Sequence, residues 1–201
     1  MPSLNIVIFS DYICPFCFLA HEIVKRIKKK YDLNVLWRPF ELHPLRSMMP
    51  NINTPYIKMV WANVQRIAKK NKIEIKLPKY LPVSRKALET AEFAREYNKF
   101  DECHNLIFHA YFLEGKNIED QTVLLKIIDD LGLSTDELKQ KWKEEIYYPI
   151  IRASIRELHS VGITAVPAFF IGNETQRILV GVHPQEQLEN VIQKAQLDLR
   201  Q

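Results

Sequence analysis

Residues 10–19 read SDYICPFCFL, so that two cysteines, Cys14 and Cys17, enclose a Pro-Phe spacer. The run before them, residues 4–9 (LNIVIF), is rich in β-branched and aromatic residues and is short enough for a buried strand. Apolar residues recur at helical spacing after Cys17, so we expect a helix to begin at Cys14. A Cys-x-x-Cys pair between a strand and a helix predicts a redox-active dithiol.

The expected position of Cys14 favours a thiolate. In the first turn of a helix, unpaired N–H groups and the positive end of the dipole stabilise an anion. Cys17 comes three residues later and returns to the same side of the helix, close enough for a disulfide but deeper in the protein. We therefore expect Cys14 to be the nucleophile and Cys17 the resolving thiol. Pro15 suits the first helical turn, and Phe16 puts an apolar side chain beside the reactive sulfur.

The cysteine pair has two other interpretations. A structural zinc ion needs four ligands, but the only other cysteine is Cys103 and there is no second pair, so no metal site is expected. Two buried, inert cysteines are the remaining alternative.

The bulk composition is that of an ordinary globular protein. Of the 201 residues, 47% are apolar, which is enough for a proper core. The 28 basic and 24 acidic residues give a formal charge of +4, and the lysine runs fall at the ends of expected helices, so nucleic-acid binding is not expected. Neither a secretory signal nor a membrane-spanning run is visible. We expect a cytoplasmic protein, where a cysteine pair is more often catalytic than structural.

The order of expected elements divides the chain. A second strand over residues 33–40 is expected to lie parallel to the first, because a helix connects them. Helical patterns then fill residues 54–161, with capping residues at Thr54, Ser84 and Ser134 and a break at Pro149. Strand patterns return in residues 168–172 and 177–181 as a hairpin, and a closing helix starts at Pro184. We therefore predict one domain made of residues 1–53 and 162–201, with residues 54–161 as an inserted helical domain.

Two further polar residues fall near the expected site. Glu41 follows the second strand and is a candidate proton carrier for Cys17, although a loop salt bridge or a surface position is the favoured interpretation. His21 lies one helical turn after Cys17, where a partly exposed histidine is expected.

Several phrases together resemble one known family. They are CPFC at residues 14–17, WRPFEL at 37–42, YFLEGKNI at 111–118, GITAVP at 162–167 and GVHP at 181–184. With the helical segment between them, these phrases are similar to the DsbA-like thioredoxin family, and within it to the cytoplasmic FrnE-type branch of dithiol–disulfide oxidoreductases or isomerases. Members of that branch often have Trp where this chain has Phe16.

The resemblance implies a fold, an activity and a binding mode. The fold would be α/β and thioredoxin-like, a mixed sheet flanked by helices with a large helical insertion. The activity would be exchange with protein thiols and disulfides, with no cofactor beyond the redox-active disulfide, and with glutathione or a thioredoxin-type protein as electron donor. Pro167 would be cis and face the cysteines, and Val166 would bind an extended substrate beside Pro15 and Phe16.

Two alternatives remain open. Related proteins of the kappa-class glutathione transferase and hydroxychromene-carboxylate isomerase type use glutathione and typically carry Ser at the position of Cys14. The other alternative is a binding module or holdase whose cysteines do no chemistry.

Overall fold

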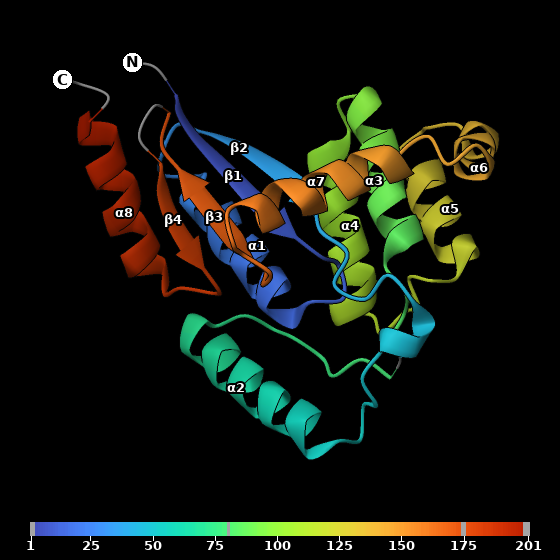
Figure 1. Ribbon diagram of the computed structural model, residues 1–201, viewed down its shortest axis with the longest axis horizontal. Coiled ribbons are helices and arrows are strands. Elements are labelled where there is room, and N and C mark those ends of the chain that lie inside the picture. Colours follow the sequence, from blue (N-terminus) through green and yellow to red (C-terminus); the bar gives the residue numbers. More distant parts are fainter. Residues whose placement is uncertain (1–2, 80, 174–175, 199–201) are drawn as a thin grey trace.

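The computed structural model describes residues 3–79, 81–173 and 176–198. Its centre is a four-stranded mixed sheet (Figure 1), whose strands are β1 (Leu4–Ser10), β2 (Leu33–Pro39), β3 (Ala168–Ile171) and β4 (Arg177–Val180). Their order is β2-β1-β3-β4, with β2 parallel to β1 and both hairpin strands antiparallel to their neighbours. The expected parallel pair and hairpin are confirmed, although β2 ends one residue before Phe40.

Helices cover both faces of the sheet. On one face α1 (Pro15–Ile27) and α8 (Gln185–Asp198) contact each other, and α8 also packs on β1 and β3. Alternate residues of β1, including Ile6 and Ile8, are buried, as expected for a strand with a covered face. On the other face α7 (Tyr148–Ser160) crosses at the β2 end of the sheet.

The remaining helices lie between β2 and β3 in the chain. They are α2 (Pro55–Asn71), α3 (Arg85–Glu96), α4 (Phe100–Phe112), α5 (Gln121–Asp130) and α6 (Thr135–Lys143), after a short 3-10 turn η1 (Arg46–Met48). Figure 1 shows α3 to α6 grouped at the end of the molecule away from α8, with α2 standing apart from them. Of the described residues between 54 and 161, none is in a strand, as the sequence predicted.

Local sequence explains most helix boundaries. The hydroxyl of Thr54 accepts from the Ile57 N–H at 3.3 Å and that of Ser134 from the Glu137 N–H at 3.2 Å, so both predicted caps are confirmed. Ser84 occupies the N-cap of α3 but makes no such bond, so its predicted capping bond is wrong. Pro149 lies in the first turn of α7, where a missing N–H is tolerated, and the helical pattern breaks just before it.

One apolar core runs through the sheet side and the helical side. The ring of Phe18 in α1 stacks on Phe112 of α4 at 5.1 Å between centroids, and Phe108 lies 5.9 Å from Phe18. All three side chains are fully buried. Helix α1 is therefore fixed by helices on its far side as well as by the sheet, while the division into two domains stays a prediction.

Candidate active site

Cys14 lies at the junction between β1 and α1. It is the N-cap residue of α1, and the backbone N–H of Cys17 donates to its sulfur at 3.4 Å. Pro15, which has no N–H to leave unpaired, occupies the first helical turn. The Cys14 residue is buried, with 5% of its surface exposed. Pro15 and Phe16 are half-buried and are the more accessible part of the motif.

Cys17 lies deeper and is fully buried. Both cysteines are free thiols. Burial raises the pKa of the Cys17 thiol well above its ordinary value, and the hydrogen bond and the charge of Cys14 raise it further. The arrangement therefore pairs an outer sulfur at a helix start with an inner thiol that holds its proton.

The loop before β3 reaches the outer sulfur. The Cys14 thiol donates to the backbone carbonyl of Val166 at 3.6 Å, across 152 residues of sequence. The Val166–Pro167 peptide bond is cis, and both residues are buried. The carbonyl of Pro167 accepts from the Gly181 N–H at 2.7 Å, which ties this loop to the end of β4.

Asp11 is a fully buried acid directly before the cysteine turn. Its carboxylate accepts from the Leu42 N–H at 2.7 Å and from the Ile13 N–H at 3.3 Å, so it joins the turn to the loop after β2. Burial raises the pKa of Asp11 to about 7; the two N–H donors oppose the rise, and the neighbouring Glu41 adds to it.

Glu41 lies on the same loop and is also buried. Its Oε2 accepts from Arg85 at the start of α3, at 2.7 Å from Nε and 2.5 Å from Nη2. The Arg85 guanidinium also lies over the Tyr148 ring, 4.2 Å from its centroid. The carboxylate of Glu41 is thus held in a buried ion pair next to Asp11.

Tyr12 connects the turn to the helical side. Its hydroxyl and His104 Nδ1 of α4 form a buried hydrogen bond of 2.8 Å. The turn that carries Cys14 is therefore fixed from three directions, by the Val166 loop, by the Leu42 loop and by α4.

This geometry agrees with a comparison against known families. The model of the DSBA-like thioredoxin domain matches residues 5–193. The chain belongs to the DsbA-like thioredoxin family. Over 176 residues, covering 85% of this chain and 88% of the relative, this DsbA-like chain is 34% identical to the uncharacterized protein YwbO of Bacillus subtilis (strain 168).

Solved structures share the DsbA-like fold over nearly their whole length. The probable DsbA oxidoreductase SCO1869 from Streptomyces coelicolor has a TM-score of 0.81 at 19% identity, covering 96% of this chain and 89% of that one. A 2-hydroxychromene-2-carboxylate isomerase has 0.78 at 16%, covering 97% and 95%. The cytosolic disulfide reductase DsbM from Pseudomonas aeruginosa, also solved with GSH, has 0.71 at 16%, covering 98% and 97%. The predicted family and thioredoxin-like fold are confirmed.

The DsbA-like structure brings most predicted site residues together. The Cys14 sulfur contacts both the Cys17 N–H and the Val166 carbonyl. Pro15, Phe16 and Pro167 adjoin these residues in the chain, whereas Glu41 forms an ion pair with Arg85. The expectation of a partly exposed His21 is wrong: it is 6% exposed, because α4 covers it, and its Nε2 lies 3.2 Å from Asn105 Oδ1.

Sequence reasoning passed over Asp11. An acid placed between a buried strand and a cysteine pair was the available signal. In the described part of the chain, no group of three or more His, Cys, Asp or Glu side chains is arranged to hold a metal ion. Nor does any described helix have the length and apolarity to cross a membrane.

Proposed function

We propose that this protein is a thiol–disulfide oxidoreductase or isomerase of the FrnE type that acts on protein disulfides through Cys14 and Cys17. The observation that carries the proposal is the position of the Cys14 sulfur. It lies at the start of α1, 3.4 Å from the Cys17 N–H and 3.6 Å from the Val166 carbonyl. The N-terminal end of α1 and the Cys17 N–H face this sulfur, which is the setting in which a cysteine acts as a nucleophile.

The reaction consists of two exchanges. The Cys14 thiolate attacks one sulfur of a substrate disulfide; the substrate S–S bond breaks, one substrate thiolate leaves, and a mixed disulfide forms. Cys17 then loses its proton and attacks the Cys14 sulfur, which releases the second substrate thiolate and leaves a Cys14–Cys17 disulfide. The substrate gains two electrons. Run in reverse, the same steps oxidise a dithiol.

The proton of Cys17 needs an acceptor, because burial keeps this thiol protonated. Glu41 was the candidate from sequence, but its carboxylate is engaged by Arg85. Asp11 is better suited, since its pKa of about 7 allows it to take and release a proton near neutrality. We propose Asp11 as the proton carrier, with the neighbouring Glu41 helping to raise its pKa.

Substrate binding is proposed at the Val166–Pro167 loop. The Pro167 carbonyl is already used by the Gly181 N–H. The strand-like bond to an extended substrate is therefore proposed at Val166, whose carbonyl loses its Cys14 donor when the thiol becomes a thiolate. Pro15 and Phe16 are the half-buried apolar groups beside the sulfur and provide the opposite wall.

The proposed setting is the cytoplasm, with glutathione or a thioredoxin-type protein returning electrons to the pair. Support comes from the similarity in fold to DsbM, which is described as a cytosolic disulfide reductase and was solved with GSH.

A glutathione-dependent isomerase or transferase is the second candidate. The similarity to 2-hydroxychromene-2-carboxylate isomerase favours it, because a fold of this kind accommodates that chemistry. In this case Cys14 would react with glutathione, and Cys17 would be dispensable.

Three single substitutions separate these functions. We expect Cys14→Ser to abolish reduction of an oxidised peptide, and Cys17→Ser to accumulate mixed disulfides with it that mass spectrometry detects. Cys103→Ser is the matched control, because this third thiol is fully buried in α4 and should change neither result. Unchanged exchange in Cys14→Ser would refute the mechanism. Turnover by Cys17→Ser with glutathione adducts alone would favour the second candidate, and binding of unfolded chains with no exchange would favour a holdase.

A further inference from the structure

A groove of about 580 Å³ lies between α1 and α4, over the end of β2. Its walls include Val24 of α1, Leu106 of α4 and Leu131 at the end of α5. The volume is in the range of small-molecule sites, which is about 300–1,000 Å³. Neither cysteine lines the groove, nor do Val166 and Pro167, so it is separate from the proposed exchange site.

The floor of the groove is aromatic and uncharged. The rings of Trp37 and His104 lie 4.6 Å apart between centroids, and His21 is 4.9 Å from His104. Burial lowers the pKa of His21 to about 4 and that of His104 well below its ordinary value, so both imidazoles are neutral at pH 7. A flat ring placed on this floor meets aromatic faces and edges rather than charges.

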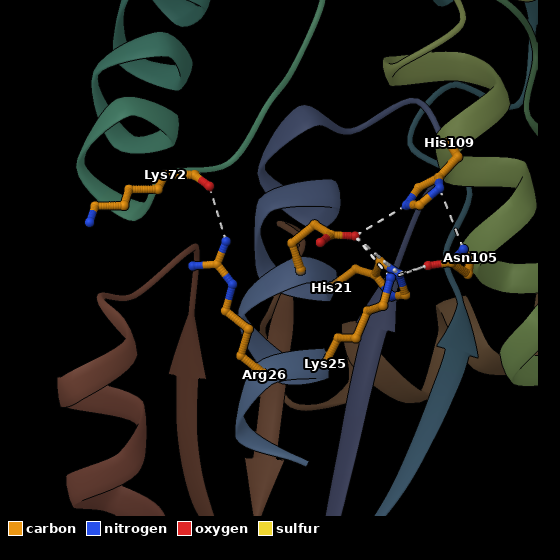
Figure 2. A network of polar contacts seen from close by, with 7 residues as sticks. His21, Lys25, Arg26, Lys72, Asn105 and His109 are labelled. Carbon is orange, nitrogen blue, oxygen red and sulfur yellow. Dashed lines mark hydrogen bonds and ion pairs between the residues drawn. The ribbon is translucent and has the colours of Figure 1, made fainter. Parts of the chain in front are cut away.

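The rim is polar but balanced in charge. Lys28 is paired with Asp101 at 2.7 Å, and Lys25 donates to Asn105 at 2.7 Å. Glu102, which pairs with Lys99 at 3.3 Å, is the other acid of the rim, so the lining includes two lysines and two acids. Figure 2 shows Lys25 and His21 reaching from α1 toward Asn105 on α4. Each lysine ammonium has three N–H donors, so both keep donors for a ligand.

We propose that this groove is a binding site for a small, planar, uncharged aromatic compound with a hydrogen-bond acceptor. The ring lies on the floor formed by Trp37, His21 and His104. The acceptor takes an N–H from Lys25 or Lys28. The balanced rim gives no preference for a net charge, while the aromatic floor penalises charged groups that lose water there. This site does not depend on the proposed disulfide exchange.

Titration with 2-naphthol, followed by calorimetry and by the imidazole NMR signals of His21 and His104, tests the site. We expect saturable binding that shifts both signals. Leu106→Trp fills the groove and should weaken binding by about tenfold or more. Leu131→Trp fills the groove from the other wall, and it provides the same test if Leu106→Trp folds poorly. Leu77→Trp is the matched control, since it narrows a separate cavity beside α2, and should change affinity by no more than about twofold.

The charge preference is tested with two relatives of the same size, 2-naphthoate and 2-naphthylmethylammonium. Each should bind at least about threefold more weakly than 2-naphthol. Absence of saturable 2-naphthol binding would overturn the site, and so would an affinity in both groove-filling variants that equals that of the wild-type protein. Tighter binding of either charged compound would overturn the assigned ligand class.

Discussion

Asp11→Asn tests the buried carboxyl that joins the cysteine turn to the loop after β2. The wild-type carboxyl is fully buried, and its pKa is raised from 3.8 to about 7 because burial disfavours the charged form. Asn has nearly the same shape but no proton to exchange in this range. Comparing the variant with the wild-type protein therefore separates the free-energy cost of ionising the buried carboxyl from the contribution of its contacts.

The sign follows from the direction of the shift. The folded protein binds the proton more tightly than the unfolded chain, so this group's stabilising contribution is complete below pH 3.8 and is lost as the pH rises through about 7. At about 1.4 kcal/mol for each pKa unit, a shift of about three units amounts to about 4 kcal/mol. Asn also loses one acceptor for the Leu42 or Ile13 N–H, which costs about 1–3 kcal/mol at every pH.

The assay is urea unfolding of both proteins, followed by far-ultraviolet circular dichroism from about pH 4 to about pH 8 under reducing conditions. The stability difference, wild type minus variant, should fall by about 4 kcal/mol across that range. Taking the difference cancels the titration of other groups. A difference that stays constant with pH, or that rises, would refute the account of Asp11 as a destabilised buried carboxylate.

Three other substitutions have defined outcomes. His21→Gln should show the opposite pH dependence, because the pKa of His21 is lowered from 6.5 to about 4. The contribution of His21 to the free energy of unfolding is present above pH 6.5 and is lost as the pH falls through about 4. It amounts to roughly 3 kcal/mol in the same difference measurement. Phe18→Ala removes a fully buried ring that stacks on Phe112 and should cost about 3–5 kcal/mol in urea unfolding; a loss near zero would contradict its place in the core. Ser134→Ala removes the cap of α6 and should cost about 1 kcal/mol, with no effect on the reactivity of Cys14.

Features encoded within a few residues were predictable from sequence. The apolar run before the cysteines, the spacing of Cys14 and Cys17, and the Thr54 and Ser134 caps each depend on neighbours in the chain, and the structure has them where they were expected. The hairpin before the last helix was predictable for the same reason.

Contacts between distant segments were not predictable in this way. The ion pair between Glu41 and Arg85 spans 44 residues, and the bond between Tyr12 and His104 spans 92. Neither has a periodicity or spacing that a single sequence displays. The burial of His21 was not predicted, because α4 covers the face of α1 that carries it and no neighbouring residue in the sequence indicates this contact. The approach of Val166 to Cys14 came only from the family resemblance.

The most direct test of the central claim is the equilibrium of the wild-type protein with glutathione redox buffers, with free thiols trapped and counted by mass at each ratio. Dithiol exchange predicts one two-electron transition, in which Cys14 and Cys17 lose two hydrogen atoms together while Cys103 stays reduced. A Cys14–glutathione adduct that persists at every ratio, or the absence of any reaction at Cys14, would contradict the account.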